Sequence, residues 1–221
     1  MVIGFPGLGR PCNKDDIQAA GAAHLQELRA YWEALRDGGQ PPLRAQIDPR
    51  GIEGLLGGAF ILERVAPGVA RFRISGSHLA QLAGCDPRGM PFSAVFDPAG
   101  RDRLSGALEQ VFAGPAHIEL RLEAERGVGR PALAARCLIL PLRSETGQTD
   151  LALGGMVLCG DPGRRARRFF LRKVNVTALP PATRVAIEKP FKASGFAETV
   201  TAFDGPTAAA PAHLRLVHSQ A

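Results

Sequence analysis

Hydrophobic residues at helical spacing predict the first element of the chain. From Asp15 or Asp16 to about residue 35, apolar positions lie three and four residues apart, which gives a helix with one apolar stripe. The stripe consists of Leu25, Leu28, Trp32 and Leu35. Such a stripe needs a partner, which can be the sheet of this chain or a second copy of it.

The next segment predicts a short helix and a hairpin. Asp48 followed by Pro49 is a favourable N-terminal cap for a helix that ends near Leu56. Residues 59–66 and 69–75 have the length and composition of strands, and Pro-Gly between them predicts the turn of a hairpin.

The stretch from Arg71 to Phe96 is predicted to form a concave element, here called the cup, around which the rest of the chain is organised. The end of the second strand runs into Gly76, Ser77 can cap a short helix, and a Gly/Pro-rich connection then returns two aromatic residues to the core. The candidate ligand pocket in and beside this cup comprises Phe72, Ile74, His78, Leu79, Leu82, Phe92, Phe96, Leu108 and Phe112. These residues are first of all core, and they form a pocket only if a cavity lies among them. His78 either faces a ligand or is a structural residue, and the structural role is the commoner one.

The second half of the domain predicts one more helix and three strands. Asp97-Pro98 starts a helix with an apolar face, and residues 117–124, 132–142 and 151–159 read as strands. The last two are apolar on both faces, so helices must cover both sides, and the stripe helix is the best cover for the outer side. The predicted fold class is α+β, a five-stranded antiparallel sheet with helices on one face and an N-terminal helix. Residues 71–75 and 117–123 alternate cleanly and are expected at the sheet edges.

Charge is distributed unevenly along the chain. The net charge is +6, and ten Lys/Arg against four Asp/Glu after residue 160 account for all of it. We therefore divide the chain into a flexible N-terminus (1–14), a neutral domain with its N-terminal helix (15–160) and a basic, partly disordered extension (161–221).

The basic extension contains a weak candidate site for anions, namely Arg164, Arg165, Arg167 and Arg168. Arg164 and Arg168 have the R-x-x-x-R spacing of some cyclic-dinucleotide receptors, but the companion motif is absent. The cluster also suits nucleic acid or an anionic membrane surface. A solvated tail is the simpler interpretation.

Catalytic and metal signatures are missing from the sequence. No phosphate-binding loop, zinc-protease motif or nucleophile elbow occurs, and the four cysteines form no C-x-x-C pair. We expect neither an enzyme nor a metal site, and no disulfide framework. Without a secretory signal or an apolar run of membrane-spanning length, the expected location is the cytoplasm.

The order of these motifs resembles the PAS-like domain family of alphaproteobacteria over about residues 31–159. The residues that carry the resemblance are Trp32, Leu35, Arg36, Pro42, Arg44, Ile47, Asp48, Pro49, Leu56, Phe72, Arg73, Gly76, Ser77, Leu79, Gly84, Gly89 and Phe92. The resemblance implies a PAS fold, a sensory and protein-interaction role, and dimerisation through the helix before the first strand. It names no ligand. Haem is disfavoured because residues 97–112 contain no histidine, and flavin because the surroundings of Cys85 depart from the photosensor motif.

The functional hypothesis is a non-enzymatic bacterial signalling protein whose PAS-like domain binds a small molecule or a protein partner. The alternative is binding of nucleic acid, an anionic membrane surface or a cyclic dinucleotide through the basic extension. We expect a homodimer through the apolar stripe, because the helix reaches upstream of the domain. If the stripe instead caps its own sheet, the chain can stay monomeric.

Overall fold

The computed structural model describes residues 14–114, 116–127, 130–163 and 165–180, with side chains from residue 22 onward. These residues belong to one compact unit. Most of the expected flexible N-terminus, Arg164 and residues 181–221 of the basic extension lie outside the described residues.

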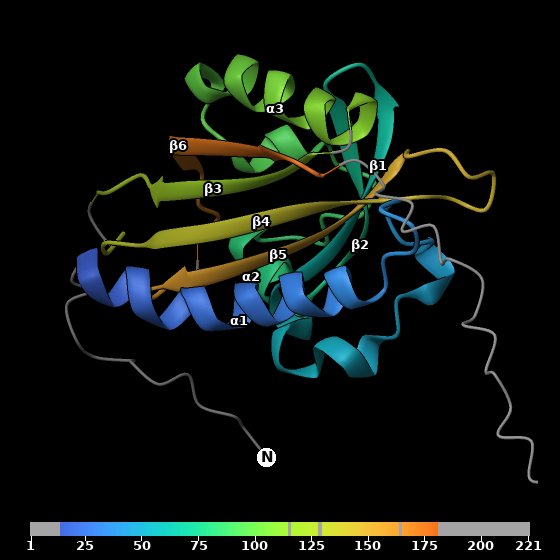
Figure 1. Cartoon of the computed structure of the whole chain (residues 1–221). Coiled ribbons are helices and arrows are strands. Elements are labelled where there is room, and N and C mark those ends of the chain that lie inside the picture. The colour runs from blue at the N-terminus through green and yellow to red at the C-terminus, as the bar shows by residue number, and fades with distance from the viewer. Residues whose placement is uncertain (1–13, 115, 128–129, 164, 181–221) are drawn as a thin grey trace, which may run out of the picture. The chain divides into compact units, whose positions relative to one another are not determined.

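Six strands form one fully antiparallel sheet (Figure 1). In chain order they are β1 (Ala59–Ala66), β2 (Val69–Ser75), β3 (Ala116–Ala124), β4 (Ala134–Leu142), β5 (Leu151–Cys159) and β6 (Phe169–Ala178). Across the sheet the order is β2-β1-β5-β4-β3-β6. The α+β class and the antiparallel pairing expected from the sequence are confirmed, and β2 lies at one edge as predicted, but the sheet has six strands rather than the predicted five.

The sixth strand also corrects two other predictions. β6 comes from the segment assigned to the extension, and it pairs with β3 from Ala116↔Ala178 to Ala124↔Phe169. The domain therefore continues beyond residue 160, and β3 is not an edge strand. The sequence pattern of β6 was ambiguous because a register shift beside Arg121 leaves Arg172 as an extra residue, which breaks the two-residue period.

Helices cover both faces of the sheet (Figure 1). On one face lie α2 (Ser77–Ala83) and α3 (Arg101–Ala113), with the 3-10 turns η3 (Phe92–Val95) and η4 (Pro98–Gly100). On the other face, α1 (Lys14–Ala34) packs on β4 and β5, and η2 (Pro49–Gly58) contributes Ile52 and Leu55 to the same apolar cluster. A further turn, η1 (Arg44–Gln46), precedes η2.

The apolar stripe of α1 is used within the chain. Leu25, Leu28 and Trp32 are buried with Leu138, Leu140 and Leu153 of the sheet, and Leu35 packs against this cluster. The prediction that this helix covers the outer sheet face is confirmed. The stripe is therefore not available as a dimer interface, which corrects that assignment.

Two of the three predicted caps occur. The carboxylate of Asp48 accepts a 2.9 Å hydrogen bond from the Arg50 amide, and that of Asp97 accepts a 3.0 Å bond from the Ala99 amide. Ser77 is not a cap, because Gly76 occupies the N-cap position of α2 and no side chain caps that helix.

Two further observations bear on the chain as a whole. Within the described part of the chain, no helix has the length and hydropathy needed to cross a membrane. Cys159, at the end of β5, is disulfide-bonded, which the spacing of the cysteines did not indicate.

Candidate functional site: a charged hollow beside α1

The predicted ligand pocket is a packed core. Seven of its nine residues are buried in one cluster, namely Phe72, Leu79, Leu82, Phe92, Phe96, Leu108 and Phe112. The ring centroid of Phe92 lies 5.5 Å from that of Phe60, 5.4 Å from that of Phe72 and 5.0 Å from that of Phe96. These distances are those of aromatic rings in direct contact, so the side chains fill the space that a ligand would need.

The other two predicted pocket residues lie outside this packing. Ile74 is 45% exposed, near the end of β2. His78 is half-buried in α2, against the backbone of Gly57, where an added Cβ would overlap its imidazole ring. Burial lowers the pKa of His78 below its usual value. His78 therefore packs between elements and does not line a cavity with the phenylalanines.

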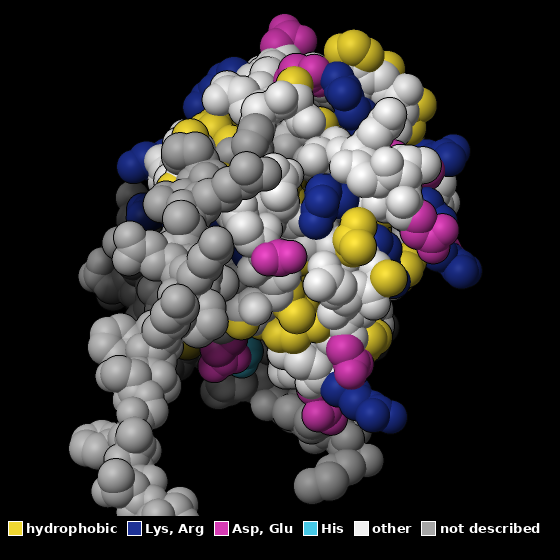
Figure 2. Space-filling view, turned by 45° about the vertical axis from the view of Figure 1, so that its right-hand side comes forward, with side chains coloured by type: hydrophobic (Ala, Val, Ile, Leu, Met, Phe, Trp, Pro, Cys, Tyr) yellow, Lys and Arg dark blue, Asp and Glu magenta, His cyan; other side chains and the backbone are white. Residues whose placement is uncertain are grey.

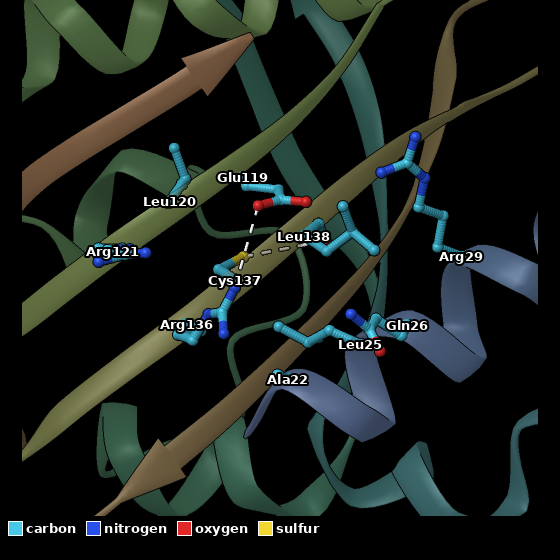
Figure 3. A pocket seen from close by; sticks show the side chains of 10 residues that line it. All are labelled: Ala22, Leu25, Gln26, Arg29, Glu119, Leu120, Arg121, Arg136, Cys137 and Leu138. Atoms are coloured by element: carbon cyan, nitrogen blue, oxygen red, sulfur yellow. Dashed lines mark hydrogen bonds and ion pairs between the residues drawn. The ribbon is translucent and has the colours of Figure 1, made fainter. Parts of the chain in front are cut away.

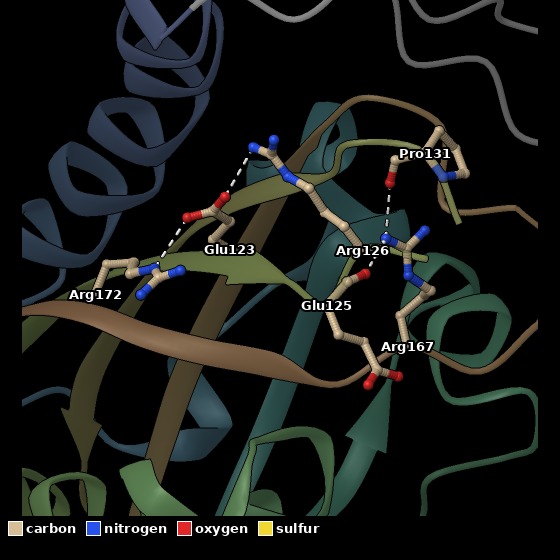
Figure 4. A network of polar contacts seen from close by, with 6 residues as sticks. All are labelled: Glu123, Glu125, Arg126, Pro131, Arg167 and Arg172. Carbon is tan, nitrogen blue, oxygen red and sulfur yellow. Dashed lines mark hydrogen bonds and ion pairs between the residues drawn. The ribbon is translucent and has the colours of Figure 1, made fainter. Parts of the chain in front are cut away.

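The predicted anion-binding cluster is not a continuous surface. Arg167 is buried, and its Nη2 donates hydrogen bonds of 2.8 Å to the carbonyl oxygens of Glu125 and Pro131 (Figure 4). Its own amide donates a 3.0 Å bond to the carbonyl of Leu82. Arg167 thus joins the end of β3, the β3–β4 connection and α2. Arg165 and Arg168 are exposed, and Arg164 lies outside the described residues.

Charges of both signs are mixed elsewhere on the surface. On the face in Figure 2, Lys and Arg side chains are interspersed with Asp and Glu. In β6, Arg172 donates to the Glu123 carboxylate at 2.9 Å and stacks over the ring of Phe170 at 5.4 Å. Arg172 therefore already has partners within the domain.

A hollow of about 90 Å³ lies between α1 and strands β3 and β4, and sequence reasoning did not predict it. Figure 3 shows its lining, with α1 on one side and the two strands on the other. The lining residues are Ala22, Leu25, Gln26, Arg29, Glu119, Leu120, Arg121, Arg136, Cys137 and Leu138. Leu25 and Leu138 form its apolar part. In the sequence, the only sign of this hollow is the polar face of β3, whose alternating pattern predicts the solvent side of an edge strand.

The hollow carries more positive than negative charge. Arg29, Arg121 and Arg136 contribute three cations, and Glu119 contributes one carboxylate, 4.0 Å from Arg136. Such a partly enclosed lining favours an anionic group over a neutral one, because the surrounding protein excludes water and strengthens the attraction between charges.

His117 lies two residues before Glu119 on β3. Its side chain is 2% exposed, and neither ring nitrogen has a hydrogen-bond partner within the described part of the chain. Burial lowers its pKa, and the nearby charge of Arg29 adds to this effect, while the Glu119 carboxylate opposes it. Burial of the ring thus favours the neutral imidazole.

The residues present do not suggest a metal centre. Within the described ranges, no group of three or more His, Cys, Asp or Glu side chains is arranged to hold a metal ion.

Comparison with known proteins identifies the type of domain. The family model described as PAS domain matches residues 21–157, which include α1 from residue 21 and almost all of the sheet through β5. β6 lies outside the match. No curated protein matches the chain.

Proposed function

The chain belongs to the PAS domain family, and from this premise we propose that it is a non-enzymatic signalling protein that docks a protein partner over the hollow beside α1. A sensory or signalling role follows from the family. Docking at this hollow, the absence of catalysis and a cytoplasmic location are parts of the proposal.

The observation that carries this proposal is the contrast between the two faces of the sheet. On the α3 face the phenylalanine cluster occupies the interior, with ring centroids 5.0–5.6 Å apart. On the α1 face, β3 carries a polar row beside the hollow, where charged side chains from a helix and two strands converge. A domain with a filled interior and a concave charged surface is better suited to a macromolecular partner than to an internal small molecule.

Site-specific photocrosslinking tests this function. A photoreactive amino acid is placed at Gln26, which lines the hollow, and in a matched protein at Gln110, which is exposed on α3 of the opposite face. After irradiation in cells of the native host, we expect one dominant protein adduct from position 26 that is absent from position 110. The same adducts from both positions would contradict docking at the hollow.

Native mass spectrometry of the full chain gives the complementary test. We expect the mass of the polypeptide without a retained small molecule, because the candidate pocket is packed. The contrary result would be a small molecule retained at one copy per chain in the parent protein and in the exposed control Gln110→Trp, but lost in Leu108→Trp. This result would favour an internal sensor instead.

The alternative function, through the basic extension, receives no support from the described residues. Arg167 is buried and Arg172 is paired with Glu123, so two of the cations that define the segment are used inside the domain. We therefore do not propose nucleic acid, a membrane surface or a cyclic dinucleotide as the ligand.

The homodimer stays a prediction, and it needs a surface other than the α1 stripe. Analytical ultracentrifugation of the full chain tests it directly.

A further inference from the structure

Three cations are aligned across three neighbouring strands. In the register of the sheet, Arg121 of β3 lies directly opposite Arg136 of β4 on one side and Lys173 of β6 on the other. Directly paired residues of an antiparallel sheet point to the same face, and neighbouring strands are about 4.8 Å apart. Lys173, Arg121 and Arg136 therefore form one row, which we call the cation row, across the face that carries the hollow.

The cation row opposes stability in the isolated domain. Like charges placed directly opposite each other in a sheet repel, and opposite charges would be favourable at the same positions. Among the described residues, Arg121 and Lys173 form no ion pair, and Arg136 lies 4.0 Å from the Glu119 carboxylate. At the end of β3, by contrast, the Glu123 carboxylate forms ion pairs with Arg126 of the β3–β4 connection and Arg172 of β6, at 2.8 and 2.9 Å.

Arg29 adds a fourth cation from α1, which forms one side of the hollow. It forms no ion pair with any described carboxylate. Arg29, Arg121 and Arg136 line the hollow from a helix and two strands, with Arg29 on the α1 side and the other two on the strands (Figure 3). Lys173 extends the row to the next strand, away from the hollow. An anionic group in the hollow would contact donors from several directions, which is the arrangement that charge-assisted hydrogen bonds require.

We propose that the cation row and the hollow bind an acidic segment of a protein partner, with one carboxylate in the hollow and further carboxylates along the row. This inference rests on the proposed docking function and specifies the chemistry of the partner. Binding would replace repulsion between the cations by attraction to the segment, so the segment would also stabilise the domain.

The surroundings favour an acidic peptide over a nucleic acid. The Glu119 and Glu123 carboxylates lie on the same face of β3 as Arg121, and they would repel a continuous phosphate backbone. A peptide with spaced acidic side chains can place neutral residues opposite these glutamates. Leu25 and Leu138 in the lining also offer apolar contact to the stems of such side chains.

The test uses the full chain and a fluorescein-labelled oligoglutamate peptide at low ionic strength, followed by fluorescence anisotropy. The double variant Arg121→Gln/Lys173→Gln removes two members of the row. The control Arg50→Gln/Arg101→Gln removes the same charge from two exposed positions of η2 and α3 that lie outside the row. We expect the row variant to bind about tenfold more weakly and the control to bind within about twofold of the parent protein.

A second measurement separates loss of binding from loss of fold. Because the cations of the row repel one another, the row variant should melt at a higher temperature than the parent protein at low salt. The peptide should raise the melting temperature of the parent protein but not that of the row variant. A row variant that binds weakly because it is unfolded would instead melt lower.

Three results would overturn the inference: no binding of the peptide, equal loss in the row and control variants, or row-dependent preference for single-stranded DNA or anionic vesicles of matched charge. None of these results affects the photocrosslinking at Gln26. A partner captured at Gln26 without row-dependent binding of the peptide would support the docking function and contradict only the proposal that the bound segment is acidic.

Discussion

The indole Nε1 of Trp32 donates a 2.9 Å hydrogen bond to the backbone carbonyl of Pro141. The ring is fully buried, so α1 is fixed to β4 by one polar contact inside an apolar cluster. Arg36 covers the same ring, with its guanidinium carbon 5.3 Å from the centroid. This contact fixes the position of α1, and therefore of the residues that line the hollow.

The variant Trp32→Phe should lower the free energy of unfolding by about 1–3 kcal/mol, because it leaves the buried Pro141 carbonyl without its donor. Urea denaturation followed by circular dichroism measures this, since the variant has no tryptophan left for fluorescence. Glu27→Gln, on the exposed side of α1, is the control and should change the value little. Equal values for both variants would show that the hydrogen bond does not hold α1.

The filled core gives a second prediction, in which two Gly→Ala variants have opposite effects on the stability of the domain. A Cβ on Gly154 of β5 would overlap the ring of Phe60, which belongs to the phenylalanine cluster, so Gly154→Ala should destabilise the domain by about 1–3 kcal/mol. A Cβ on Gly106, which is exposed in α3, meets no atom within 4 Å. Gly106→Ala should therefore stabilise the domain by about 0.5–1 kcal/mol through helix propensity.

Thermal unfolding of the two variants checks this pair. If Gly154→Ala were neutral, the cluster would have free space, and an internal ligand would again be plausible.

Much of the fold could be predicted because it is encoded locally. The stripe of α1, the hairpin turn at Pro67-Gly68 and the caps at Asp48 and Asp97 depend on residues within a few positions of one another. The sixth strand could not be predicted in the same way. Its alternation is broken at Arg172, and its pairing partner β3 lies about fifty residues upstream.

The site was predicted less well than the fold, and for a different reason. Sequence could identify the phenylalanines as apolar neighbours, but whether apolar residues enclose a cavity or fill it depends on packing in three dimensions. Likewise, Arg121, Arg136 and Lys173 are ordinary charged residues in the sequence. Only the register of three strands places them side by side.

The buried Arg167 gives a third prediction. Arg167→Ala removes the donor to the carbonyls of Glu125 and Pro131, so it should destabilise the domain by about 2–4 kcal/mol. Because these contacts tie the start of β6 to the β3–β4 connection, hydrogen exchange at β6 amides should accelerate most. Arg168→Ala removes the same charge from an exposed neighbour and is the control. Equal protection of β6 in both variants would argue against this anchoring role.

The buried His117 predicts a loss of stability in acid. Burial lowers its pKa in the folded protein, so the unfolded chain binds a proton more readily. The stabilisation by neutral His117 is therefore fully present above the ordinary pKa of histidine and decreases as the pH falls below it. The charged groups around its ring are Arg29 and Glu33 from α1, Arg36 just after α1 and Glu119 from β3, with opposing effects on that pKa.

The melting temperature measured between about pH 5 and pH 8 checks this prediction. His117→Gln keeps a polar side chain but cannot titrate, so its melting temperature should fall less steeply with acid than that of the parent protein. The pKa of His78 is also lowered by burial, so part of the slope should persist until His78→Gln is added. A parent protein whose melting temperature is flat across this range would mean that water or a hydrogen-bond partner reaches the His117 ring, and that its neutral form is not what the fold requires.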